Sequence, residues 1–181
     1  DQHGTAVVVL AGLINACKVN NKPINECKIV ILGAGAAGAA CAKILMESGA
    51  KQIIILDRQG ILHNQRNFDD NPMKKWLSQN TNLLNIQGSL DDALIDADIF
   101  LGMSGPNLIT REQILTMSTN PVVFALSNPD PEILPGEIND IVSIIATGRS
   151  DFPNQVNNVL GFPFLFRGAL DAKAKEISND M

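Results

Sequence analysis

Three glycines in the segment Gly33-Ala-Gly-Ala-Ala-Gly38 have the spacing of a turn that binds phosphate groups. An apolar, β-branched run precedes them and helix-forming residues follow, so the segment is expected to join a strand to a helix N-terminus. Gly33 would allow the sharp turn, Gly35 would let the backbone approach a pyrophosphate, and Gly38 would let the helix pack closely on the strand. Free N–H groups at Ala36 and Ala37 would then face the anion at the positive end of the helix dipole.

An acid follows at the distance that a dinucleotide site requires. Asp57 ends a second β-rich run about 20 residues after the glycines, where a carboxylate can accept hydrogen bonds from an adenosine ribose. This charge disfavours a 2′-phosphate and therefore favours NAD over NADP. Arg58 leaves NADP open, because its guanidinium could receive that phosphate if the side chain turned inward. Glycines also end strands for purely structural reasons, but the ordered combination of turn, helix and acid predicts a dinucleotide site.

Small and amide-bearing side chains follow later strands of the predicted fold. Ser104 and Gly105 come after a short apolar run, and Asn128 comes after a longer one. Four amide side chains occupy the five positions that end at Asn157 and Asn158. Such residues are common in ordinary surface turns. Open α/β sheets place their ligands at the carboxyl ends of parallel strands, however, so we expect these residues to gather at one ligand-binding edge.

The motifs need parallel strands with helices between them. Strands are expected at 28–32, 52–56, 83–86, 98–101, 121–126 and 141–146. Helices are expected at 6–19, 36–47, 73–79, 89–97, 111–117 and 160–174. The predicted fold class is α/β, a doubly wound parallel sheet of the Rossmann-like type with strand order 3-2-1-4-5-6. It would carry an N-terminal helix capped by Thr5 and a C-terminal closing helix.

The composition describes one globular domain and argues against several classes of partner. The chain has 181 residues, of which 45% are hydrophobic and 18% are charged, which is enough for one well-packed core. A net charge of -5 argues against nucleic acid and anionic membranes as partners. No stretch approaches the ~20 apolar residues of a membrane helix, and the cysteine spacings match no zinc or disulfide framework. We therefore expect a cytoplasmic protein with reduced thiols.

Four motifs together resemble the dinucleotide-binding domain of the malic enzymes. They are Asp1-Gln-His-Gly-Thr-Ala6, the glycine turn, Phe124-Ala-Leu-Ser-Asn-Pro129, and the stretch 147–158. The resemblance covers essentially the whole chain, and the form of the motifs is similar to that of the bacterial enzymes. It implies that residues 1–181 are the NAD(P)-binding domain of a malic enzyme whose N-terminal catalytic domain is absent from this chain. Because the sequence starts inside the first of these motifs, we expect it to be a piece of a longer protein.

The resemblance also implies a reaction and roles for individual residues. Malic enzymes oxidatively decarboxylate L-malate to pyruvate and CO2 with NAD or NADP and with Mg2+ or Mn2+. Asp1 matches the family's metal-ligating aspartate, while Asn128 and Asn158 match amides that hold the substrate carboxylate near the nicotinamide. Ser104 and Gly105 match the loop beside the cofactor, where Asn128 also lies.

The family's base and acid, a lysine and a tyrosine, belong to the segment before Asp1, and this chain contains no tyrosine. None of its residues is therefore expected to be catalytic, and the isolated chain is expected to be inactive. The partners implied are L-malate, the missing N-terminal domain and further copies of the chain in a homo-oligomer.

Two other hypotheses fit parts of the sequence. One is the cofactor domain of a different two-domain dehydrogenase, of the amino-acid or methylene-folate type. The motif around Asn128 and the pair Asn157 and Asn158 argue against that hypothesis. The other is a non-catalytic module that binds NAD(H) and signals through a partner, which the absence of acid, base and metal ligands favours for the isolated chain.

Overall fold

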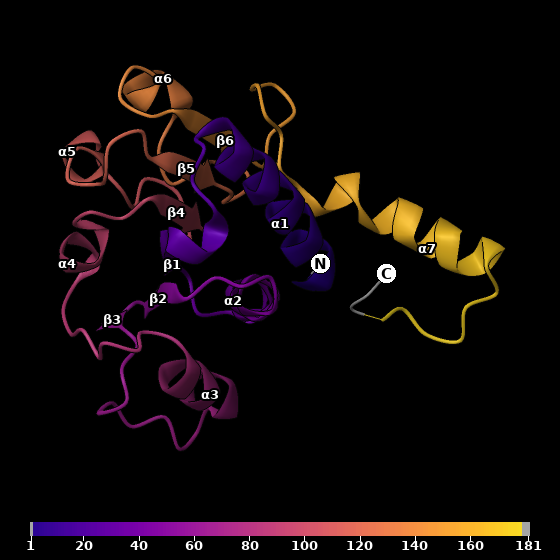
Figure 1. Cartoon of the computed structure of the whole chain (residues 1–181), viewed down its shortest axis with the longest axis horizontal. Coiled ribbons are helices and arrows are strands. Elements are labelled where there is room, and N and C mark those ends of the chain that lie inside the picture. Colours follow the sequence, from indigo (N-terminus) through magenta and orange to yellow (C-terminus); the bar gives the residue numbers. More distant parts are fainter. Residues whose placement is uncertain (1, 179–181) are drawn as a thin grey trace.

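The β-branched runs of the sequence form a six-stranded sheet in the computed structural model, which describes residues 2–178 (Figure 1). The strand order is β3-β2-β1-β4-β5-β6. The order of the five strands β2, β1, β4, β5 and β6 is the one that the sequence predicts. Neighbouring strands are parallel except for β3, which runs antiparallel to β2. The bounds are Lys28–Leu32 for β1, Gln52–Asp57 for β2, Gly60–Ile61 for β3, Ile99–Gly102 for β4, Val122–Ala125 for β5 and Ile144–Thr147 for β6.

Helices cover both faces of this sheet, which confirms the doubly wound α/β class. Residues of α1, α2 and α3 share a core with one face, and residues of α4, α5 and α6 share a core with the other. The bounds are Gln2–Val19 for α1, Ala36–Glu47 for α2, Pro72–Asn80 for α3, Leu90–Leu94 for α4, Arg111–Ile114 for α5, Pro135–Ile138 for α6 and Phe162–Asp171 for α7, with 3-10 turns η1 at Ile24–Glu26 and η2 at Asn158–Leu160. Among residues 2–178, no helix is both long enough and apolar enough to cross a membrane.

Strand β1 supplies both halves of the core, because successive side chains of a strand point to opposite faces. Ile29 and Ile31 are buried on the side of α1 and α2, whereas Val30 and Leu32 are buried on the side of α4, α5 and α6. Strands β2 and β4 pair with β1 along its length. Burial on both faces explains why the strand is an unbroken apolar run in the sequence.

The prediction of a strand at 83–86 is wrong. Asn82 and Asn85 adopt positive φ values of 50° and 52°, which interrupts any extended run. The Asn82 side chain accepts from the Ile86 N–H at 2.9 Å and donates to the Ile86 carbonyl at 2.7 Å, closing a turn. Leu83 and Leu84 are consequently exposed. The third strand is instead the short antiparallel β3, so the sheet is mixed at that edge.

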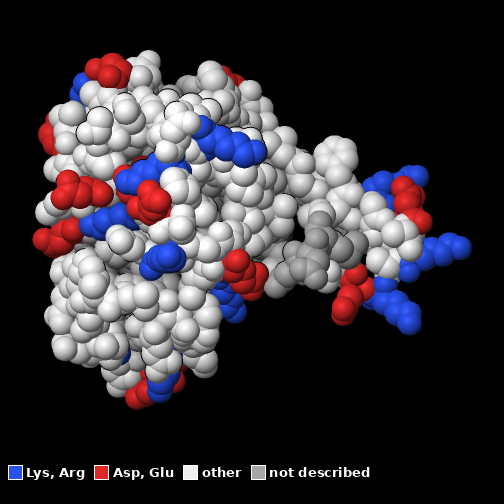
Figure 2. Space-filling view, viewed as in Figure 1, with Lys and Arg blue, Asp and Glu red and all other residues white. Residues whose placement is uncertain are grey.

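The two terminal helices also differ from expectation. Helix α1 begins at Gln2, so Thr5 lies inside it and does not cap it. Helix α7 forms, but it does not close over the sheet, since none of its residues is buried. It extends away from the rest of the fold, and charged side chains of the helix and of the segment after it gather at that end of the molecule in Figure 2. Its exposed large side chains are Phe162, Phe164, Phe166 and Leu170.

Helix α1 offers a direct test of how the core is built. Leu13 has no exposed surface, whereas its neighbour Ile14 is 43% exposed. We predict that Leu13→Ala lowers the free energy of unfolding by about 2–5 kcal/mol, because it removes contacts and leaves a cavity. The control Ile14→Ala should change it by less than about 1 kcal/mol. Urea unfolding followed by circular dichroism measures both, and equal losses would contradict the assignment of faces.

Candidate cofactor site

The glycine turn brings the backbone of β1 against the start of α2. A β-carbon at Gly38 would lie 1.8 Å from the carbonyl oxygen of Gly33, so no larger residue fits there without moving the chain. Gly33 itself has φ +129°, a conformation that side chains rarely adopt, and a β-carbon there would lie 2.7 Å from the Met103 carbonyl oxygen. The close packing that the sequence predicts for Gly38 and the sharp turn that it predicts for Gly33 are therefore present.

Gly35 differs from the other two glycines because it faces open space. No heavy atom lies within 4 Å of the position that its β-carbon would take. Gly35 is the N-cap of α2, and no side chain caps that helix. The N–H groups at Ala36 and Ala37 are in its first turn, where Ala36 is exposed and Ala37 is half-buried. An uncapped helix N-terminus beside open space is suited to a phosphate group.

The acid at the end of β2 is paired with two cations that the sequence patterns do not reveal. Both carboxylate oxygens of Asp57 lie 3.0 Å from Arg66 Nη2, and Lys74 Nζ lies 2.7 Å from Oδ2. The N–H of Gln59 donates to Oδ1 at 2.9 Å. Burial raises the pKa of Asp57, but these hydrogen bonds outweigh it and hold the pKa below its ordinary value. Asp57 is therefore a carboxylate at neutral pH.

Arg58, which the sequence offers as a receptor for a 2′-phosphate, lies exposed beside this cluster. Arg66 and Lys74 are the cations that contact Asp57, and their side chains are 15% and 28% exposed. Two positive charges against one carboxylate give the cluster a net positive charge. Asp57 therefore repels a 2′-phosphate less than the sequence alone suggests.

The loops after β4, β5 and β6 lie at the same edge of the sheet. Ser104 and Gly105 follow β4, and Asn128 follows β5. A β-carbon at Gly148, just after β6, would lie 2.8 Å from Asn128 Nδ2, so the amide rests against that glycine. Asn157 Nδ2 donates to the Gly148 carbonyl at 3.0 Å. Gly148 thus brings the two amide motifs together, as the parallel topology predicts.

The predicted substrate residue Asn158 begins η2 and lies against the first turns of α1. A β-carbon at Gly4 would lie 3.5 Å from Asn158 Cβ. Asn157, in contrast, caps η2 by accepting from the Val159 N–H at 3.0 Å. Asp1, the predicted metal ligand, lies outside the described residues. Over the stretch 2–178, no three His, Cys, Asp or Glu side chains gather to hold a metal ion.

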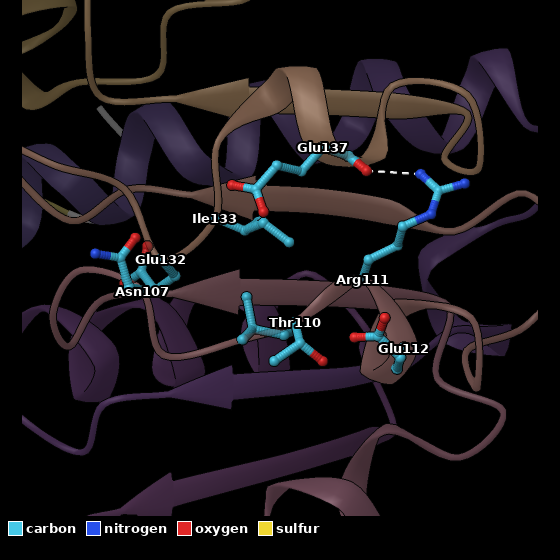
Figure 3. A pocket seen from close by; sticks show the side chains of 8 residues that line it. Asn107, Thr110, Arg111, Glu112, Glu132, Ile133 and Glu137 are labelled. Atoms are coloured by element: carbon cyan, nitrogen blue, oxygen red, sulfur yellow. Dashed lines mark hydrogen bonds between the residues drawn. The ribbon is translucent and has the colours of Figure 1, made fainter.

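A buried carboxylate, absent from the residues predicted for the site, lies behind two of these loops. Glu132 has no exposed surface, and its oxygens accept from the N–H groups of Ser104 and Ser127, each at 3.1 Å. Burial raises the pKa of Glu132, while these N–H groups oppose the rise. Figure 3 shows Glu132 beside Asn107 at one end of a pocket of about 530 Å³. A glutamate between prolines in a turn-like segment gives no sequence signal of burial.

This arrangement defines a dinucleotide-binding domain of the Rossmann type. It combines a glycine turn after the first strand, an uncapped helix N-terminus and an acid at the end of the adjacent strand. The topological switch lies between β1 and β4, where such sheets bind their ligands.

Comparison with known proteins identifies the family. The family model described as malic enzyme, NAD binding domain, matches residues 2–181. The chain is 49% identical to the NAD-dependent malic enzyme of Geobacillus stearothermophilus over 181 residues and 50% identical to the NADP-dependent malic enzyme of Halomonas elongata over 185 residues. The crystal structure of the NAD-dependent malic enzyme from Thermotoga maritima matches with a TM-score of 0.89 at 44% identity, covering 94% of this chain. The chain belongs to the malic enzyme NAD-binding domain family.

The family match excludes the hypothesis that this chain is the cofactor domain of a dehydrogenase of the amino-acid or methylene-folate type. All of this chain is aligned with both relatives, but it spans only 38% of the Geobacillus protein and 43% of the Halomonas protein. It likewise covers 46% of the Thermotoga chain. Since the names of the two relatives include both NAD and NADP, family membership alone does not decide between the two cofactors.

The open space at Gly35 predicts a variant that loses the ligand but keeps the fold. Its φ and ψ of -89° and -168° are extended and accept a β-branched residue. We predict that Gly35→Val abolishes NAD binding, because the side chain would occupy the approach to the pyrophosphate. The free energy of unfolding should fall by only about 1 kcal/mol. Gly136→Val, at another glycine with open surroundings, is the control, and unchanged NAD affinity in Gly35→Val would refute the site.

The ion pair between Lys74 and Asp57 predicts a change in cofactor preference. Lys74→Gln leaves the Asp57 carboxylate less neutralised, so affinity for NADP should fall about tenfold more than affinity for NAD, or ~1.4 kcal/mol. Calorimetric titration with each nucleotide measures the ratio. The adjacent Lys75, which pairs with Asp69 on the surface, supplies the control Lys75→Gln. Equal effects of the two variants on this ratio would show that the charge of Lys74 beside Asp57 does not affect the choice of nucleotide.

Proposed function

We propose that this chain is the cofactor-binding part of a malic enzyme, which oxidatively decarboxylates L-malate to pyruvate and CO2. In this proposal residues 1–181 form the NAD(P)-binding domain, and a catalytic domain outside this chain completes the enzyme. The observation that carries the proposal is the single sheet edge where the glycine turn lies with Asn128 and Asn157, which are joined through Gly148. The family match over residues 2–181 supports it.

The residues at this edge would hold NAD in an extended path. Asp57 would accept hydrogen bonds from the adenosine ribose, and the N–H groups at Gly35, Ala36 and Ala37 would hold the pyrophosphate. The nicotinamide half would then lie toward Ser104 and the neighbouring loops. The bound cofactor supplies the acceptor for the hydride that leaves malate. NAD is the main cofactor in this proposal, and the cations around Asp57 allow NADP as well.

The substrate would lie between this edge and the catalytic domain. Asn128 and Asn158 would donate amide hydrogen bonds to the malate carboxylate and hold it beside the nicotinamide. In the proposal Asp1 contributes one ligand to a Mg2+ or Mn2+ site. A single carboxylate does not make such a site, so its other ligands, with the acid and the base, belong to the catalytic domain. None of the described residues is catalytic in this proposal.

We also propose a cytoplasmic homo-oligomer. The three free cysteines, Cys17, Cys27 and Cys41, fit a reducing compartment. The exposed aromatic side chains of α7 form an apolar surface that a second chain or the catalytic domain would cover. The isolated chain should therefore self-associate, and a monodisperse monomer in light scattering at high concentration would contradict this.

A chimera tests the proposed activity. The N-terminal part of the Geobacillus malic enzyme, joined ahead of this chain, should give malate-dependent reduction of NAD that requires Mn2+. The increase in NADH absorbance measures it, and Asn128→Ala in the same chimera should reduce the rate at least about tenfold. A chimera that binds NAD but never oxidises malate would favour a non-catalytic NAD(H)-sensing module instead.

A further inference from the structure

Glu132 is a buried acid for which the proposed reaction has no role. A buried carboxylate is costly unless its oxygens are hydrogen-bonded. Both oxygens of Glu132 are satisfied, and by two different loops: Oε1 accepts from the Ser104 N–H after β4, and Oε2 accepts from the Ser127 N–H after β5. One side chain therefore joins the two loops at the edge where the cofactor is expected.

The backbone around Glu132 strengthens the same connection. The Asn107 N–H donates to the Pro131 carbonyl at 3.2 Å, and the Ile109 N–H donates to the Glu132 carbonyl at 3.4 Å. The last residue of β4, Gly102, lies against the Glu132 side chain. A β-carbon at Gly102 would lie 2.4 Å from the Glu132 carboxyl carbon, so the strand leaves room for this side chain.

We propose that Glu132 is a positioning residue that sets the spacing between the Ser104 loop and Asn128, and so shapes the binding site for the nicotinamide half of the cofactor. This inference rests on the proposed function. Asp57, which would bind the adenosine half, lies at the end of β2, and β1 separates β2 from β4 and β5 in the sheet. The Glu132 carboxylate accepts from the loops after β4 and β5, which lie away from β2. Its effect should therefore be confined to one half of the ligand.

Affinities for two ligands distinguish an effect on the nicotinamide half of the site from an effect on the adenosine half. NADH carries the nicotinamide, whereas ADP-ribose keeps the adenosine and the pyrophosphate without it. Glu132→Gln preserves the size of the side chain but removes the charge, and its amide nitrogen cannot accept from an N–H. We expect affinity for NADH to fall about tenfold, while affinity for ADP-ribose stays within about twofold of the unmodified chain. The fluorescence of bound NADH should shift as well.

Glu112→Gln is the matched control. Glu112 lines the same pocket at the end away from Glu132 and is exposed (Figure 3). It should leave both affinities unchanged. A Glu132→Gln variant that loses affinity for both ligands equally, or for neither, would overturn the positioning role, because a general support of the fold would act on both halves.

A second variant and a ligand-free measurement keep the inference testable if Glu132→Gln does not fold. Gly102→Ala introduces a β-carbon against the Glu132 carboxyl without changing any charge. Either variant should raise the hydrogen-exchange rates of the Ser104 and Ser127 amides at least about tenfold, while amides of β2 keep theirs. Unchanged exchange at both serines would overturn the inference. Failure of the unmodified chain to bind ADP-ribose would instead refute the proposed cofactor site, so the two failures are distinguishable.

Discussion

The close approach of α2 to β1 is the constraint on which the site depends. Only hydrogen atoms fit between Gly38 and the Gly33 carbonyl. That contact seats the helix on the strand, and the same turn leaves Gly35 facing open space at the N-terminus of the helix. The strand is in turn held by pairing with β2 and β4 and by burial on both faces. Backbone packing thus leaves a helix N-terminus open to solvent, and the proposed binding of phosphate there would need no charged side chain.

Two carboxylates organise the two ends of the same sheet edge in different ways. Asp57 is held between Arg66 and Lys74, which keep it ionised and make its surroundings net positive. Glu132 is satisfied instead by backbone N–H groups from two loops. In the proposed function, the charges around Asp57 affect the choice between NAD and NADP. The hydrogen bonds of Glu132 set the spacing of the loops after β4 and β5, near Asn128. Between the two carboxylates lies the glycine turn, so in the proposed function the cofactor would extend along this edge from Asp57 to the loops that Glu132 joins.

Local sequence patterns predict the parts of the fold in which local and global preferences agree. The bounds of β1 and α2 and the order of the five parallel strands match the prediction, because burial on both faces of β1 and the glycine spacing leave few alternatives. The strand at 83–86 fails because two asparagines take left-handed conformations that an apolar run does not reveal. Arg66, Lys74 and Glu132 could not be found, since their partners lie in other segments of the chain and only the tertiary structure brings them together. Helix α7 has a clear apolar pattern, but sequence pattern alone does not say what that face packs against.

The most direct test of the central claim is a calorimetric titration of this chain with NAD and with NADP, each with and without Mn2+ and malate. We predict saturable binding of NAD that is indifferent to malate and to the metal, because the glycine turn and Asp57 lie entirely within the chain. Binding of neither nucleotide would mean that the glycine turn serves packing alone or that the site forms only with the catalytic domain. That result would contradict the claim that residues 2–178 hold a complete cofactor site.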